Sequence, residues 1–307
     1  MTITRALHFS LVLAAFGVLA APPNLAQAQV EETTLSARAV ALGTGVRASA
    51  ASTSALAQNP ANLSLTRVYH LEGTTTYEPG VGRFAFGTAI VDSSSSRLGA
   101  GLSFRGLVGG DDTAYGGLDF RGGLSLPVSD ALGIGVSVRY VSLPGVMPDG
   151  TQVNYAKGLT MDAALRATLI PNLHVAVLGS NLIDRHSALV PVRVGGSASY
   201  TIADTLTLGL DAMFNLSQNV PGAPLLIGAG VEWLSGNAVP IRVGYAYDEL
   251  TRTHYFTGGL GYIDQSVGID LSIRQALSGE NATYLMLGIR YFYDASGGSQ
   301  TGVQQGL

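Results

Sequence analysis

The charged residues of this chain are the side chains that could do chemistry, and most of them stand singly within apolar, glycine-rich stretches. In residues 159–168, Asp162 and Arg166 alternate with leucine, methionine and alanine. Side chains two residues apart project from the same face of a strand, so these charges share a polar face. The same pattern holds for a larger set: Arg139, Asp162, Arg166, Arg193, Asp211, Glu232, Arg242, Asp248, Asp270, Arg274 and Arg290. Acids and arginines interleaved in this way either select a passing solute or pair with one another.

Hydrolysis is one chemistry that such residues could perform. His186 or His254 could act with Asp184 or Asp248 and a nearby serine. A catalytic triad requires a defined mutual orientation, however, and no recognisable motif surrounds these residues. We therefore predict polar loop and strand-end residues at these positions, no catalytic residues and no enzyme activity.

Metal, cofactor and nucleic-acid sites have little support. Asp111 and Asp112 could contribute to a Ca²⁺ site, but the spaced series of oxygen ligands that Ca²⁺ requires is absent. The chain contains no cysteine, which excludes a disulfide scaffold and a thiolate zinc site. A net charge of -4 without a basic block argues against a nucleic-acid partner. We predict no metal and no cofactor.

An alternation of apolar and polar residues with a period of two positions these charges. In residues 132–140, the apolar residues Leu132, Ile134 and Val136 alternate with small or polar ones, and the pattern continues to Tyr140. Residues 206–215 and 241–248 repeat it. A period of two sustained over about ten residues indicates strands with one apolar face.

We predict about fourteen such strands between residues 67 and 293. Their centres lie near Thr75, Phe86, Leu102, Phe120, Val136, Ala163, Val175, Val194, Leu210, Ala229, Val243, Leu260, Ile269 and Leu287. The connections alternate between short turns, such as 203–204, and longer loops, such as 142–157 and 181–191. Short turns at one end and longer loops at the other are typical of outer-membrane barrels, in which an even strand number places both termini in the periplasm.

The first 28 residues have the features of a secretory signal peptide. Arg5 precedes an apolar run over residues 6–21, and Ala26-Gln27-Ala28 forms a cleavage site before Gln29. A permanent anchor helix is the alternative, but the run is shorter than the roughly 20 residues that span a bilayer. We therefore predict export, with a mature chain that begins at Gln29.

The composition favours a membrane barrel over a soluble protein. Charged residues make up 12% of the chain, against about 25% in soluble domains. Beyond the signal peptide no stretch is long and apolar enough for a membrane-spanning helix, whereas a barrel needs lipid-facing residues only at alternate positions. With aromatic residues near many strand ends, the sequence predicts an all-β fold, a closed antiparallel transmembrane β-barrel with charges facing the lumen. A soluble jelly roll is the alternative.

The segments that flank the predicted barrel lack this alternation. Residues 29–66 are rich in alanine, serine and threonine and predict a short helix-and-loop segment, while residues 294–307 are rich in glycine, serine and glutamine and predict a flexible tail. The last strand carries Gly288, Tyr291 and Tyr293, which resemble the C-terminal signal that the barrel-assembly machinery recognises in its substrates.

Two features together resemble the FadL-like superfamily of outer-membrane channels for long-chain fatty acids and hydrocarbons, which includes PorV-like proteins. One is the run of small residues over 36–47, followed by Asn59-Pro60-Ala61 and the first strand; the other is the strand count. The resemblance implies a fourteen-stranded barrel whose residues 29–66 fold into the lumen as a plug. Asn59, Pro60 and Ala61 would then belong to that plug.

The resemblance favours a channel for the uptake of small hydrophobic molecules. A PorV-like accessory barrel that docks secreted or envelope proteins, and a structural or general porin, are the alternatives. We interpret the lumen-facing charges chiefly as ion pairs that hold barrel and plug in shape, because a charge on the lipid face costs ~2–4 kcal/mol at mid-bilayer. The expected partners are the outer-membrane bilayer, the barrel-assembly machinery and a small hydrophobic molecule.

Overall fold

The computed structural model describes residues 36–110, 116–146, 150–218, 220–236, 238–278 and 282–293. The predicted signal peptide, with its cleavage site at Ala28 and Gln29, lies outside the described residues, as do the predicted tail and the candidate Ca²⁺ ligands Asp111 and Asp112.

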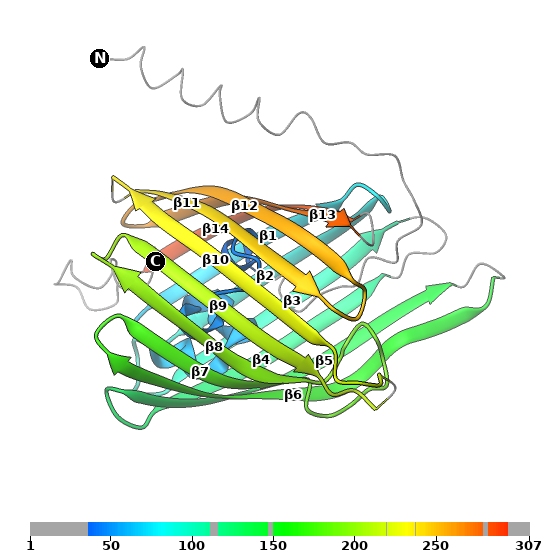
Figure 1. Cartoon of the computed structure of the whole chain (residues 1–307), viewed down its shortest axis with the longest axis horizontal. Coiled ribbons are helices and arrows are strands. Elements are labelled where there is room, and N and C mark those ends of the chain that lie inside the picture. The colour runs from blue at the N-terminus through cyan, green and yellow to red at the C-terminus, as the bar shows by residue number, and fades with distance from the viewer. Residues whose placement is uncertain are drawn as a thin grey trace, which may run out of the picture.

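Strands form almost all of the described chain beyond residue 68 (Figure 1). Their bounds are β1 Tyr69–Glu78, β2 Arg83–Asp92, β3 Gly99–Gly109, β4 Gly117–Pro127, β5 Leu132–Val146, β6 Gln152–Ile170, β7 Leu173–Ser180, β8 Arg193–Ile202, β9 Leu206–Asn215, β10 Leu225–Ser235, β11 Val239–Asp248, β12 Thr253–Ile263, β13 Val267–Ser278 and β14 Thr283–Tyr293. Each strand pairs antiparallel with the next, and β1 pairs with β14 from Tyr69↔Tyr293 onward. The sheet therefore closes without a free edge, and the fourteen-stranded antiparallel barrel predicted from the sequence is confirmed.

The two faces of the barrel wall have opposite chemistry. On β6, Leu165 is 44% exposed on the outside, whereas its neighbour Arg166 is 3% exposed and faces inward. On β5, Val136 is 48% exposed and Ser137 is buried at 1%. An apolar outer band around a charged interior is the arrangement of a barrel that crosses a lipid bilayer, where lipid is the apolar solvent.

Replacing Leu165 by arginine is expected to impair assembly, because Leu165 lies near the middle of the outer band and a charge there costs ~2–4 kcal/mol. Leu169→Arg is the matched control: Leu169 is exposed on the same strand, near its end, where the cost falls to ~0–1 kcal/mol. Heat-modifiable migration of the two variants measures the folded fraction. Equal folded fractions would show that the outward assignment of Leu165 is wrong.

The two ends of the barrel differ in their connections. The turns between β6 and β7, β8 and β9, and β10 and β11 are short and lie at the end where β1 begins and β14 stops, which we call the turn end. At the β8–β9 turn, Ala203 and Asp204 both have positive φ, the backbone of a tight hairpin. The other end, the loop end, carries the longer connections 110–116, 181–192 and 216–224.

The loop predicted over residues 142–157 is wrong in its extent. β5 continues to Val146 and β6 begins at Gln152, so this hairpin projects beyond the other strands at the loop end (Figure 1). Pro144 cannot donate to a strand ladder. The ladder instead shifts its register between Leu143 and Pro144 and then resumes.

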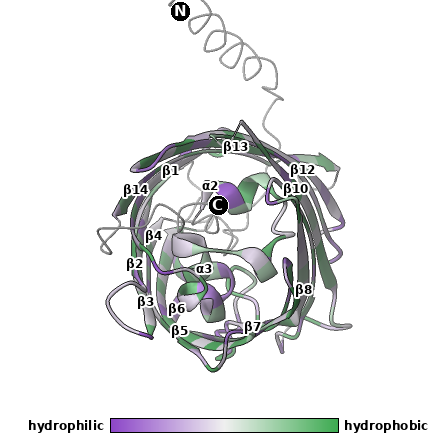
Figure 2. Cartoon of the chain, turned by 90° about the vertical axis from the view of Figure 1, so that its left-hand side faces the viewer, coloured by the Kyte–Doolittle hydropathy of each residue, from purple (hydrophilic) through white to green (hydrophobic). Residues whose placement is uncertain are grey.

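The described residues before β1 form four short helical elements inside the barrel (Figure 2). They are α2 Ala37–Ala41, η2 Arg47–Ser49, α3 Ser52–Gln58 and η3 Pro60–Ser64. We call residues 36–64 the luminal segment. Helices this short are marginal on their own in water, so contacts with the barrel wall must hold them. None of the helices in the described ranges is long and apolar enough to cross a membrane.

Candidate functional site

The barrel lumen gathers nearly all the residues singled out in the sequence, and the luminal segment occupies its turn-end half. Helix α2 lies against β11–β14. The Arg38 guanidinium donates to both carboxylate oxygens of Glu232, at 2.8 Å from Nη2 and 3.0 Å from Nε. The Thr257 hydroxyl donates to the Ala41 carbonyl at 2.8 Å. The wall thus holds α2 by charge at its start and by a neutral hydrogen bond at its end.

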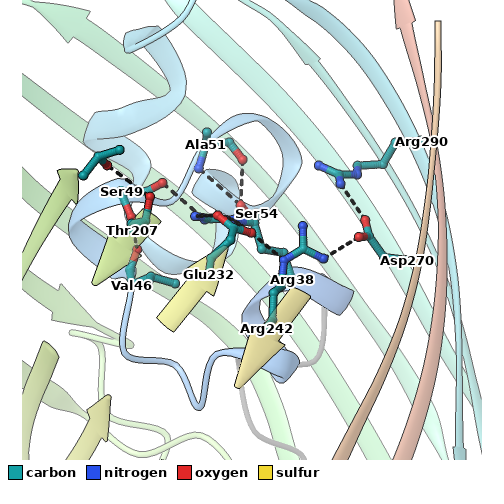
Figure 3. Close-up of polar contacts among 11 residues, drawn as sticks. Arg38, Val46, Ser49, Ala51, Ser54, Thr207, Glu232, Arg242, Asp270 and Arg290 are labelled. Carbon is teal, nitrogen blue, oxygen red and sulfur yellow. Dashed lines mark hydrogen bonds and ion pairs between the residues drawn. The ribbon is translucent and has the colours of Figure 1, made fainter. Parts of the chain in front are cut away.

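The contact between Arg38 and Glu232 is the first link of a chain of ion pairs that joins residues from four strands, β10, β11, β13 and β14 (Figure 3). Arg242 on β11 donates to Glu232 at 2.5 Å and also pairs with Asp270 on β13. Arg290 on β14 donates to the other Asp270 oxygen at 2.5 Å. Each carboxylate therefore lies between two arginines. This alternation lets buried charges persist, because each has partners on both sides.

A second ion pair holds the luminal segment at η2, the next helical element after α2. The Arg47 guanidinium lies 3.2 Å from the Asp211 carboxylate on β9, and the Arg47 backbone N–H donates to the same carboxylate. The Ser197 hydroxyl on β8 accepts from the Ala48 N–H at 2.7 Å and bonds to Asp211. The wall therefore recognises the backbone of η2 as well as a side chain.

Helix α3 contacts β1–β4, across the ring from the strands β7–β9 that contact η2. Ser52 bonds to the His70 ring and Thr53 bonds to the Glu72 carboxylate. At the helix end, the Arg121 guanidinium donates to the Ala57 carbonyl at 3.1 Å. The luminal segment is therefore fastened to both sides of the ring.

The predicted plug motif lies at the turn between α3 and η3. The Asn59 amide, fully buried, donates to the Arg47 carbonyl at 3.0 Å and so ties this turn to η2. Pro60 starts η3, a position where its missing N–H costs nothing. The Ala61 carbonyl accepts from the Ser125 hydroxyl at 2.8 Å. The three residues thus connect the luminal segment to itself and to β4.

Glycines on the inner wall allow this backbone to approach closely. A Cβ added at Gly135 on β5 would lie 2.3 Å from the Pro60 carbonyl carbon and from the Ala61 nitrogen. A Cβ at Gly230 on β10 would lie 2.6 Å from the Leu42 carbonyl oxygen. In both cases the added Cβ would meet backbone atoms, so no rotamer change can relieve the overlap.

We expect Gly135→Ala to push the 60–61 turn off the wall, because the added methyl meets rigid backbone. Overpacking of this kind lowers the free energy of unfolding by ~1–3 kcal/mol. Gly73→Ala is the control, since a Cβ at Gly73 has no atom within 4 Å. Urea unfolding of both variants in detergent measures the difference. Equal midpoints would contradict the close approach.

The other predicted lumen-facing charges also lie on the inner face. Arg139 donates to Asp119 at 2.7 Å, and Asp162 accepts from Arg121 at 2.6 Å. The more distant contacts are Arg166 with the Thr168 hydroxyl at 3.2 Å and Arg193 with Asp248 at 3.9 Å. The Arg274 guanidinium lies over the Tyr255 ring, 3.7 Å from its centroid.

Sequence reasoning missed several partners of these charges. Asp119 and Arg121 alternate with Leu118 and Phe120 on β4, so the period-two pattern could have identified them. Arg38 and Arg47 lie outside the strands, and no pattern in the sequence pairs them with the wall. Their partners lie 194 and 164 positions away along the chain.

Two apolar clusters on the inner face lie at the loop end and contain no residue of the luminal segment. One sector, the mouth patch, consists of Ala85, Leu107, Val141, Leu143 and Ala156 on β2, β3, β5 and β6. The other lies on the far side of the ring, on β11–β14 and just before β14, and consists of Ala246, Tyr255, Ala276, Ala282 and Tyr284. Leu189 and Val190 of the β7–β8 loop pack against the mouth patch. The mouth of the lumen therefore combines these two apolar sectors with buried ion pairs at the strand ends, Glu78 with Arg83 and Arg193 with Asp248.

The histidines considered for hydrolysis lie at the outer ends of the molecule. His186 Nδ1 is 3.7 Å from the Asp184 carboxylate, and its side chain is 63% exposed. Hydrogen bonds from the backbone N–H groups of Gln218 and His186 lower the pKa of the Asp184 carboxyl, which fits a loop-capping role. His254 contacts Tyr245 and Tyr247 on the outer face. Within the described ranges no group of three or more acidic or histidine residues could hold a metal ion.

The residues of the predicted assembly signal occupy both faces of β14. A Cβ at Gly288 would lie 3.3 Å from the Ala37 side chain, so this glycine faces the luminal segment. Tyr291 and Tyr293 are 49% and 56% exposed on the outer face near the turn end. Aromatic residues at this height belong to the interfacial girdle of a membrane barrel.

Comparison with solved structures identifies relatives of the fold. The toluene transporter TbuX of Ralstonia pickettii superimposes with a TM-score of 0.57 at 16% identity, covering 86% of this chain and 98% of TbuX. The monoaromatic hydrocarbon channel CymD gives 0.57 at 12% identity, covering 79% and 92%. A FadL homologue of Pseudomonas aeruginosa gives 0.52 at 12% identity, covering 81% and 96%. No protein-family model and no curated protein sequence matches the chain.

Proposed function

We propose that this barrel, which has the fold of the FadL-type hydrocarbon channels, lies in the outer membrane and admits small hydrophobic molecules. The observation that carries the proposal is the pair of apolar sectors at the mouth of the lumen. A pore for ions or sugars needs polar groups along its whole path, whereas apolar side chains that face inward favour an apolar solute. Monoaromatic hydrocarbons are the substrate class that the names of the structural relatives suggest.

The luminal segment supports selection rather than free diffusion. Its helices and the ion pairs around them fill the turn-end half of the lumen, where a general porin would keep an open polar path. We propose that the segment is a plug and that it must shift for a solute to pass. The lumen-facing charges then hold the plug and do not contact the solute. Docking of envelope proteins is the remaining alternative, and the uptake experiment below separates the two.

Uptake of radiolabelled toluene by intact Gram-negative cells tests the proposal, because their outer leaflet is the barrier that a hydrocarbon must cross. Cells that express the barrel should accumulate toluene faster than cells with an empty vector. Val141→Thr keeps the side-chain shape but adds a hydroxyl to the mouth patch, at a cost of ~1–3 kcal/mol. It should slow uptake by about fivefold or more.

Val138→Thr is the matched control, since Val138 lies on the same strand but is 51% exposed on the lipid face. A loss of uptake in both variants would point to impaired assembly, which heat-modifiable migration measures independently. If cells with correctly assembled barrel take up toluene no faster than the vector control, the channel proposal is wrong and the docking function becomes the better one.

A further inference from the structure

The β7–β8 loop, residues 181–192, turns into the barrel mouth instead of standing away from it. Leu189 is 9% exposed and Val190 is fully buried, although both belong to a surface loop. They pack against the mouth patch, whose residues come from β2, β3, β5 and β6. The loop therefore reaches from its own strands across the neighbouring part of the ring.

Several hydrogen bonds hold the loop in this position. The Asn181 N–H donates to Asp162 at 2.8 Å, and the Asn181 side-chain oxygen accepts from Arg139 at 3.1 Å. Its amide nitrogen donates to the Pro191 carbonyl at 3.0 Å, which joins the two ends of the loop. Further along, the Ser187 hydroxyl donates to the Tyr155 carbonyl on β6 at 2.5 Å. Asn181 is thus a latch between the loop and the charged lumen.

The other residues of the loop do not belong to the mouth patch, and the apolar residues Leu182 and Ile183 are 40% and 41% exposed. Ala188 and His186 are exposed. The Arg185 side chain folds over β6, where a Cβ at Gly158 would lie 2.7 Å from its Nη1 atom. Asp184 accepts from the Gln218 N–H of the β9–β10 loop at 2.9 Å. Only Leu189 and Val190 among these loop residues contribute apolar side chains to the mouth patch.

We propose that the mouth patch is a binding site for a small apolar molecule and that Leu189 and Val190 occupy it in the absence of ligand. This inference rests on the proposed channel function and names the site and the gate of that channel. A ligand of similar size and polarity competes with the two side chains for the same apolar surface. Binding displaces the loop, and the mouth opens on that side of the ring. The ligand can shift the equilibrium between closed and open loop only by as much as it binds the open state more tightly than the closed state.

Cysteine accessibility tests the competition directly, because the chain contains no cysteine of its own. Val190→Cys should react slowly with a membrane-impermeant maleimide. Saturating toluene should raise its labelling rate by about fivefold or more, as expected for a shift in loop population. Ala188→Cys, exposed on the same loop, should label quickly with and without toluene. An unchanged rate for Val190→Cys in toluene would overturn the proposed competition.

A reversible lock tests whether the loop gates uptake. Ser187→Cys combined with Ala156→Cys places a thiol pair where Ser187 already contacts β6 beside Ala156. The oxidised pair should reduce toluene uptake by about tenfold, and a reductant should restore it in the same cells. Equal uptake in the oxidised and reduced states would show that the loop does not gate uptake.

The combined outcomes separate this inference from the channel proposal. The wild type could take up toluene while toluene leaves the labelling of Val190→Cys unchanged and the lock has no effect on uptake. This combination would refute the gate but not the channel proposal. Absence of uptake by an assembled wild type refutes the channel. In that case Asn181→Ala, which removes the latch, still decides whether the loop can open: labelling of Val190→Cys rises if it can and stays slow if the gate is wrong.

Discussion

Deletion of residues 33–54 is expected to turn a closed barrel into a conducting one. The deletion removes α2, η2 and the start of α3, which fill the turn-end half of the lumen. Barrels of eight strands are filled by their own side chains and those of sixteen to eighteen leave an aqueous channel, so fourteen strands leave space once the segment is gone. The β7–β8 loop covers only the sector over β2–β6. Single-channel conductance in planar bilayers should rise by at least about tenfold.

The deletion also leaves Glu232 and Asp211 without Arg38 and Arg47, so assembly needs its own control. The same deletion combined with Glu232→Gln and Asp211→Asn removes the carboxylates that lost their partners. Both forms should conduct, and the second should fold more completely. Equal conductance of the intact and deleted barrels would show that the segment is no plug, and the transport and docking hypotheses would both lose their main support.

Replacement of Arg242 by methionine is expected to cause the largest loss of stability. Arg242 is 2% exposed and pairs with Glu232 and Asp270 at once. Its removal leaves two buried carboxylates each short of a partner, and breaking a buried ion pair in this way costs ~3–5 kcal/mol. Urea unfolding of the refolded barrel in detergent should show this loss.

Two further variants test the reason for that loss. Arg38→Met, Glu232→Gln, Asp270→Asn and Arg290→Met added to Arg242→Met should recover most of the stability, because every charged member of the chain of ion pairs is then removed together. Arg67→Met, at an exposed position outside the strands, should change the free energy of unfolding by less than ~0.5 kcal/mol. If Arg242→Met behaves like Arg67→Met, the chain of ion pairs contributes little to the fold.

The barrel itself could be predicted because the sequence of each strand shows which of its two faces meets lipid. Alternation in stretches such as 132–140 and 206–215 identifies both the strand and its lipid-facing side, and it does so without knowledge of neighbouring strands. All fourteen predicted centres lie within observed strands. The β5–β6 hairpin was underestimated because Pro144 and Gly145 interrupt the alternation while the pairing continues beyond them.

The interior was harder to predict because its contacts join distant parts of the chain. The alternation along each strand predicts that its charged residues face the lumen. It does not predict their partners, which depend on which strands meet the luminal segment. Arg38 and Arg47 carry no local pattern that points to β10 or β9. The inward turn of Leu189 and Val190 is likewise set by the apolar surface on β2–β6. Period and spacing describe single strands, and these contacts depend on the assembled ring.

The luminal segment comes before β1 in the chain, so it is synthesised and exported before any strand of the wall that holds it. Its anchors lie as far away as Thr257, 216 positions after Ala41. The anchors on β9–β12 are complete only once those strands have paired, and in the closed barrel β1 pairs with β14. A register slip of one residue would turn Asp211 or Glu232 toward lipid, and the luminal segment would lose its ion pair with that carboxylate. We therefore expect the luminal segment to dock only in a barrel whose register is correct, so that limited proteolysis near the N-terminus would report a misregistered barrel.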